Sequence, residues 1–144
     1  MEMSKADEEM VEAYDTVNKC LRTLCRKEYK GYSEFLKALV ANNAKVPVTE
    51  TTRLKNPAME ALLKCEVDKC KKAVTVLIQK IIVANTDTIK KDTLQLKQKD
   101  KELNAFQKKL LKDSIRMDKR KLEALKKIDL NQLSWQDLLV LNKI

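Results

Sequence analysis

The sequence predicts an all-α protein: a helical bundle of four to five helices with one long basic amphipathic helix. Three observations favour this fold class. The 144 residues include one glycine and two prolines, whereas a β-rich protein of this length needs many tight turns built from such residues. Neither residue type occurs again after Pro57. Apolar side chains recur at helical spacing along the chain, with a seven-residue repeat in its second half.

Residues 1–41 are expected to contain two helices. Ser4, with Asp7 three positions later, is typical of a capped helix start. Gly31 is predicted to end the first helix, and Ser33 to begin a shorter second one. A loop is predicted at 42–56, where proline, threonine and asparagine interrupt the helical pattern. This loop is our candidate for a mobile or partner-binding segment.

A core helix is predicted over residues 57–84. Asn56 and Pro57 indicate its start, because asparagine is a favoured N-cap and proline is favoured at the first helical position. Its apolar face includes Val74 and Ile78, which we expect to pack against the first helix. Residues 85–88 are predicted to form a turn, and the alternative is one helix that continues past residue 120. A last helix, anchored by Trp135, is expected within 129–144, beginning near Asp129 or Ser134. The whole chain, 1–144, is expected to be one domain.

The long basic helix is predicted over residues 88–127. An apolar row recurs there at every seventh position: Ile89, Leu96, Leu103, Leu110 and Met117. The companion heptad positions are polar, so the pattern predicts at most a weak coiled coil. We interpret the row as a self-association surface, because a narrow apolar stripe on a lone helix buries too little surface to stabilise it. The alternative is that the stripe lies on the protein's own bundle.

The charge is distributed unevenly along the chain, whose formal net charge is +9. Residues 90–127 carry 14 basic and 6 acidic side chains, a net charge of +8, whereas residues 1–15 carry one basic and six acidic side chains, a net charge of −5. Opposite charges favour contact between these segments, within one chain or between copies. The basic residues expected to contact a nucleic-acid backbone are Lys97, Lys99, Lys101, Lys108, Lys109, Lys112, Arg116, Lys119 and Arg120.

The four cysteines form two equally spaced pairs. Cys20 and Cys25 lie on the first predicted helix, and Cys65 and Cys70 lie on the core helix. The arrangement resembles the twin-cysteine helical hairpins, in which two disulfides join two helices, although those families have three or nine intervening residues instead of four. A spacing of five positions turns about 140° around a helix, so both members of a pair cannot face one partner or converge on one zinc ion. We therefore predict four free thiols, with Cys25 and Cys70 in the core.

Half of the six aromatic residues lie close to Gly31. Tyr29, Tyr32 and Phe35 recur at every third position, with basic residues around them. Two interpretations are open: stacking on unpaired nucleic-acid bases, or a hydrophobic clasp between the first two helices. We favour the clasp, because packed side chains usually hold a helix corner together.

The composition argues against catalysis. There is no histidine, which removes the commonest general base and metal ligand, and one glycine cannot make a phosphate-binding loop. We therefore expect no catalytic, cofactor-binding or metal-ligating residues. The acidic N-terminus is not a signal peptide, and the most apolar run, 73–84, is too short to span a bilayer. These features predict an intracellular protein, cytoplasmic or nuclear, without an integral membrane segment.

Together the observations favour a non-enzymatic interaction or scaffold protein that forms homo-oligomers through its long helix and binds a protein partner. The alternative is a protein that binds RNA or DNA without sequence specificity, because no base-reading motif is present. Attachment to an anionic membrane surface is a third interpretation. It is less favoured, since the basic helix lacks an apolar face rich in aromatic residues.

Overall fold

The computed structural model describes residues 3–42 and 55–143, and all regular structure in these ranges is α-helical. The all-α prediction is therefore confirmed, with six helices described where the sequence predicts four to five. They are α1 (Lys5–Leu24), α2 (Arg26–Ala41), α4 (Pro57–Lys69), α5 (Lys71–Gln98), α6 (Ala105–Lys126) and α7 (Trp135–Lys143). Most of the loop predicted at 42–56 lies outside the described residues, so the expectation for it stays a prediction.

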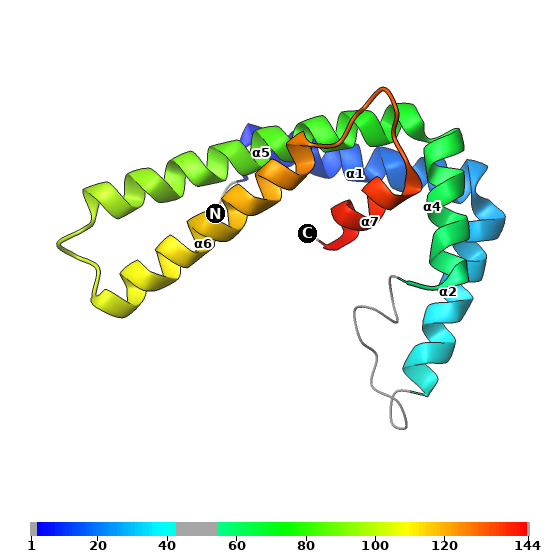
Figure 1. Cartoon of the computed structure of the whole chain (residues 1–144), viewed down its shortest axis with the longest axis horizontal. Helices are drawn as coiled ribbons and strands as arrows, with labels where there is room; N and C mark the ends of the chain where they lie inside the picture. The colour runs from blue at the N-terminus through cyan, green and yellow to red at the C-terminus, as the bar shows by residue number, and fades with distance from the viewer. Residues whose placement is uncertain (1–2, 43–54, 144) are drawn as a thin grey trace.

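α1, α2, α4 and α5 form one bent antiparallel hairpin. One limb consists of α1 and α2 and the other of α4 and α5. α1 packs along α5 and α2 packs along α4, and both limbs bend sharply at the same place (Figure 1). Cys25 separates α1 from α2, and Cys70 separates α4 from α5. The single core helix predicted over 57–84 is therefore wrong, because the backbone leaves helical geometry at Cys70. The predicted break at Gly31 is wrong, because Gly31 lies inside α2. A glycine in a helix interior costs only about 1 kcal/mol, which packing on α4 can offset.

The turn predicted at residues 85–88 is also wrong, because α5 continues through this polar segment. The hydroxyls of Thr86 and Thr88 donate hydrogen bonds to carbonyls one turn earlier, at 2.8 and 3.0 Å. The Asn85 amide donates to the backbone carbonyl of Asp118 on α6, at 2.9 Å. These polar side chains therefore bond to helical backbone without ending the helix.

The single helix predicted over 88–127 is divided between α5 and α6, because the chain reverses at residues 99–104. Asn104 caps α6: its side chain accepts a hydrogen bond from the backbone of Gln107 at 2.8 Å, and the Gln107 side chain accepts one from the backbone of Asn104 at 3.0 Å. This capping box satisfies N–H groups that would otherwise lack partners at the new helix start. The two halves of the predicted helix therefore lie antiparallel, side by side (Figure 1).

Three predicted helix starts are confirmed. Ser4 and Asn56 each accept a hydrogen bond from the N–H three residues later, at 3.2 and 2.8 Å, and Pro57 occupies the first turn of α4. Ser134, just before α7, exchanges hydrogen bonds with Asp137 at 3.0 and 3.3 Å. Local capping chemistry thus positions these helices as the sequence indicates.

The core lies between α1, α4, α5 and the C-terminal helices. Val74 and Ile78 are completely buried where α5 packs on α1, as the sequence predicts. The other large side chains that are almost completely buried include Leu63, Leu77, Leu125 and Leu138. α7 packs against α4 on the inner side of the bend (Figure 1). Within residues 3–42 and 55–143, no helix is long and apolar enough to cross a bilayer.

Candidate functional site

Two disulfide bonds join the limbs of the hairpin at the bend. Cys20 is bonded to Cys70 and Cys25 to Cys65, with Cα–Cα distances of 6.0 and 5.9 Å. The prediction of four free thiols is therefore wrong. The bonds close sequence separations of 50 and 40 residues, so they hold α1 and α2 against α4 and α5 at a fixed register.

The bends explain why the helical spacing misled the prediction. The argument from a rotation of about 140° assumes that each cysteine pair lies on one continuous helix. In the structure, Cys20 and Cys65 lie within helices, whereas Cys25 and Cys70 lie where the backbone leaves helical geometry, with ψ angles of 33° and 19°. Each bond therefore joins a cysteine within one limb to the cysteine at the bend of the other. The likeness to twin-cysteine hairpins extends to this double cross-link.

One group of potential metal ligands occurs in the described ranges. The sulfur atoms of Cys25 and Cys65 and a carboxylate oxygen of Glu28 lie within 4.8 Å of one another. Both sulfurs belong to one disulfide, whereas cysteine binds metals as a thiolate. In the oxidised protein this group therefore offers no thiolate ligand.

A two-helix arm projects from the disulfide-bonded body. Near the start of α1, Glu9 forms an ion pair with Lys80 of α5 at 2.9 Å, and the hydrogen bond and charge of this lysine lower the pKa of Glu9. Because α1 begins at Lys5 and runs antiparallel to α5, the second half of α5 extends beyond α1 and packs on α6 (Figure 1). We call residues 86–117 the arm; they comprise the second half of α5, the turn and the first half of α6.

The five residues of the heptad row are divided over the arm: Ile89 and Leu96 lie on α5, Leu103 lies in the turn, and Leu110 and Met117 lie on α6. Ile89 and Leu96 share a side of α5 with Asn85, whose amide bonds to α6, and both are half-buried. Asp92 lies on the same side, and burial together with the charge of Asp118 raises its pKa. Leu110 and Met117, in contrast, are 54% and 56% exposed. The row is therefore not one continuous surface.

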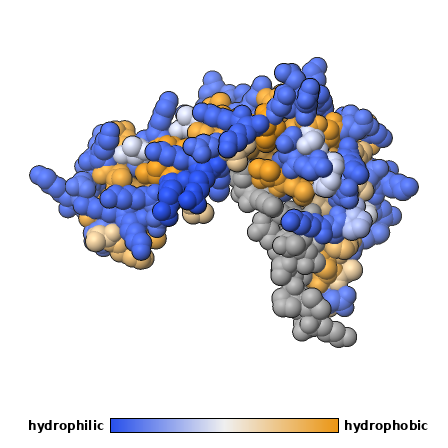
Figure 2. Space-filling model, in the orientation of Figure 1, coloured by the Kyte–Doolittle hydropathy of each residue, from blue (hydrophilic) through white to orange (hydrophobic). Residues whose placement is uncertain are grey.

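An apolar stripe runs along the outer side of α6. Phe106, Leu110 and Met117 are 68%, 54% and 56% exposed, and at about 100° per residue they lie within an arc of about 40°. We call these three residues the outer stripe. Ile115, on the opposite side of α6, is 8% exposed. Figure 2 shows apolar patches among the hydrophilic atoms of the arm.

The predicted nucleic-acid contacts fall into two groups. Lys97, Lys99 and Lys101 lie at or near the tip of the arm, and all three are exposed. On α6, a basic band lies within an arc of about 100° beside the outer stripe, and its exposed members are Lys109, Lys112, Arg116, Lys119 and Arg120. Arg116 pairs with Asp113 at 3.2 Å, and Lys108, which is half-buried, pairs with Asp100 at 2.9 Å. The rest of the band forms no ion pair with the described part of the chain.

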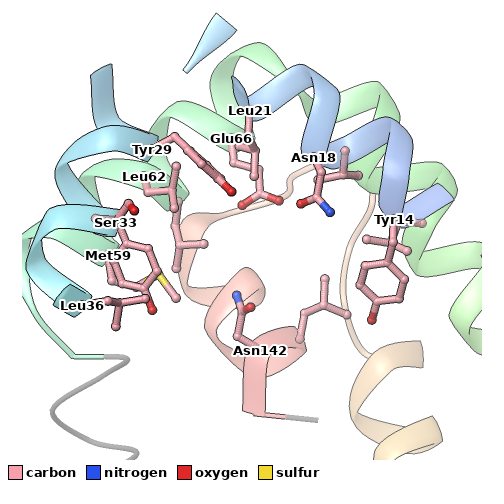
Figure 3. A pocket seen from close by; sticks show the side chains of 15 residues that line it. Tyr14, Asn18, Leu21, Tyr29, Ser33, Leu36, Met59, Leu62, Glu66 and Asn142 are labelled. Atoms are coloured by element: carbon pink, nitrogen blue, oxygen red, sulfur yellow. The ribbon is translucent and has the colours of Figure 1, made fainter. Parts of the chain in front are cut away.

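A cavity of about 400 Å³ lies on the inner side of the bend, lined by residues of α1, α2, α4, α5 and α7. We call it the inner cavity. Glu66 of α4 points into it, together with Asn18, Tyr29 and Asn142 (Figure 3). Tyr32, also in its wall, packs against the core, but the clasp predicted at the corner near Gly31 is wrong, because Gly31 lies inside α2.

Glu66 is the one buried charged side chain among the described residues, at 8% exposure. Within the described ranges its carboxylate has no hydrogen-bond or ion-pair partner, and its oxygens are therefore in contact with the open volume of the cavity. Burial raises the pKa of Glu66 from 4.5 to about 7, because a desolvated carboxylate is less stable in its charged form. The site thus combines a partly open cavity with an acidic group that has no described partner.

Two residues of these candidate sites were not predicted from the sequence, although the sequence contained a signal for each. Glu66 lies four positions after Leu62 and three after Leu63, on the apolar face of the core helix, where a charged residue is unusual. Phe106 precedes Leu110 by four positions, so it shares a helix face with a residue already in the heptad row.

Fold and site together define a disulfide-bonded bent helical hairpin that carries a basic arm and an acidic inner cavity. The chain matches no protein-family profile, no curated protein and no solved structure.

Proposed function

We propose that this protein is a non-enzymatic interaction protein that self-associates through its arm. The observation that carries the proposal is the outer stripe, in which three large apolar side chains are each more than half exposed along one line of α6. Scattered apolar residues on a surface need no explanation, but a contiguous apolar line flanked by charges is typical of a protein–protein contact. Within the heptad row, Leu110 and Met117 contact the second copy. Ile89, Leu96 and Leu103 instead pack within the arm.

Electrostatics indicate which surface of a second copy would cover the outer stripe. α6 carries eight basic and three acidic side chains, so two α6 helices packed face to face would bring like charges together. The outer side of α1 has the opposite charge. Glu8, Glu12 and Asp15 are exposed there around Val11, which is 44% exposed. We infer that α6 of one copy packs on α1 of another, a head-to-tail contact that produces rings or chains.

The first experiment tests the outer stripe. Leu110→Asp and Met117→Asp together should lower the particle mass measured by light scattering at tens of micromolar, while circular dichroism stays unchanged because both side chains are exposed in the protomer. Leu94→Asp is the matched control, since Leu94 is 53% exposed on the arm but lies outside the stripe. A wild-type protein that is already a monomer, or an unchanged mass in the double variant, would contradict the proposal.

The second experiment tests the charge pairing. Glu8→Lys with Glu12→Lys should also lower the mass, because like charges would then face the basic band. Adding Arg116→Glu and Arg120→Glu to the same chain should restore it. If the chain with all four substitutions does not associate, the α6–α1 contact is contradicted. That result would not contradict the role of the outer stripe in self-association.

A second candidate function is sequence-nonspecific binding of RNA or DNA. The basic band supports it, because Lys109, Lys112, Lys119 and Arg120 are exposed without an acidic partner in the described ranges. Lys112 and Lys119 lie on the edge of the band that is farther from the outer stripe. Lys112→Glu with Lys119→Glu should therefore weaken RNA binding and leave the particle mass unchanged. Wild-type protein that fails to bind an RNA oligonucleotide at low salt would exclude this function.

A further inference from the structure

The inner cavity has the size and lining of a ligand site. Its volume of about 400 Å³ lies within the usual range for small-molecule sites, and its walls are mainly apolar, as at Leu62 and Leu77. A few polar groups converge on one end: the Glu66 carboxylate, the Asn18 amide and the Tyr29 hydroxyl all point into the same space (Figure 3). The Asn142 amide points toward them from α7 (Figure 3). The cavity lies at the bend, away from the outer stripe.

The charge of the cavity restricts what can occupy it. Among the described residues, Glu66 is the one charged residue in the lining, and its carboxylate has no partner there. Leaving a buried carboxylate unpaired is costly, and a cation that pairs with it removes that cost. An anionic ligand would add repulsion, and a neutral ligand would leave the carboxylate uncompensated. The occupant that best fits this wall is therefore cationic.

The rest of the lining indicates an organic cation instead of a metal ion. Calcium takes six to eight oxygen ligands and magnesium requires a near-octahedral set, whereas one carboxylate with a few amide and hydroxyl groups lines this cavity. The leucine side chains of the cavity wall would bury no apolar surface against a hydrated ion. They would bury such surface against the apolar part of an organic ligand. Tyr29 and Tyr14 add aromatic rings, whose faces attract ammonium groups.

We propose that the inner cavity binds a small amphipathic organic ammonium compound. Its ammonium group donates hydrogen bonds to the Glu66 carboxylate and to the side-chain oxygen of Asn18. Its apolar body lies against the leucine walls between α4, α5 and α7. This activity is separate from self-association, because none of the outer stripe or basic band lines the cavity.

The experiment uses two probes with one apolar body. 2-Phenylethylamine is protonated at pH 8, and 2-phenylethanol is its neutral counterpart. Titration calorimetry of the full chain at pH 8 should show that the amine binds at least about tenfold tighter than the alcohol, as expected for a hydrogen-bonded charge pair. Equal affinities, or no heat from either probe at millimolar concentration, would overturn the proposal.

Three variants assign the preference to this cavity. Glu66→Gln should abolish the preference for the amine and leave the alcohol affinity unchanged, whereas Glu60→Gln, a carboxylate on the same helix outside the cavity lining, should behave like the wild type. Ser33→Trp places a bulky side chain in the cavity wall and should weaken both probes. A preference that survives Glu66→Gln, or binding unaffected by Ser33→Trp, would show that the amine binds elsewhere.

Discussion

The buried carboxylate of Glu66 predicts that the protein becomes less stable as the pH rises from 4.5 to 7. Burial raises the pKa of Glu66 from 4.5 to about 7, so between these values the folded protein binds a proton that the unfolded chain has lost. The free energy of unfolding therefore decreases with rising pH in this window and is level above it. This is the reverse of the usual behaviour of a carboxylate that forms an ion pair.

The magnitude follows from the same two values. One pH unit of difference in pKa corresponds to about 1.4 kcal/mol, so the difference between 4.5 and about 7 is worth about 3 kcal/mol. Glutamine has the shape of the protonated side chain and no charge. Glu66→Gln should therefore match the wild type at pH 4 and exceed its free energy of unfolding by about 3 kcal/mol at pH 8.

Urea denaturation followed by circular dichroism, from pH 4 to pH 8, measures this effect. The quantity to compare is the difference between wild type and variant at each pH, because other shifted groups, such as Glu9 and Asp92, are present in both proteins and cancel. Burial raises the pKa of Tyr14, which also lines the cavity, above its ordinary value of 10.0 and therefore farther from this range. Glu60→Gln is the control and should follow the wild-type profile. A constant difference between wild type and Glu66→Gln across the whole pH range would refute the reasoning.

Three further predictions concern stability. Thiol titration of the denatured, unreduced protein should find no free thiol, and detection of four thiols would contradict the cross-linked bend. Reduction should lower the free energy of unfolding by about 2–5 kcal/mol for each disulfide. Ile78→Ala should cost about 2–5 kcal/mol in chemical denaturation, because Ile78 is completely buried; a loss below about 0.5 kcal/mol would place it at the surface. Asn56→Ala should cost about 1 kcal/mol by removing the α4 cap, and an unchanged midpoint would mean that the cap contributes nothing.

The helical class, three of the helix starts and the central core could be predicted from local sequence. Ser4, Asn56 and Ser134 cap helices through atoms three residues away, so their effect depends little on the rest of the fold. Val74 and Ile78 lie at the centre of a clear apolar stripe, and such a stripe must be covered whatever the arrangement of its partners.

The positions where helices break depended on tertiary contacts. Gly31 and the polar segment 85–88 are weak helix formers, yet both lie within helices that pack on a neighbour along their length. The bends occur instead at Cys25 and Cys70, where two disulfides join the limbs. Asn104 and Gln107 form a capping box that could have predicted the helix start after the reversal at 99–104. The heptad row continues through Leu103, however, and it favoured one uninterrupted helix.

In the two candidate sites, too, some properties follow from local sequence and others only from the tertiary structure. The sequence alone determined that α6 is basic and carries apolar residues at helical spacing, because both properties follow from residue type and the 3.6-residue repeat. Only the antiparallel pairing of α5 with α6 decided which of those residues are covered and which, like Leu110 and Met117, are exposed. The burial of Glu66 likewise required α1, α2 and α7 to converge on one face of α4, since a carboxylate loses its hydration only when segments distant in sequence exclude water from it.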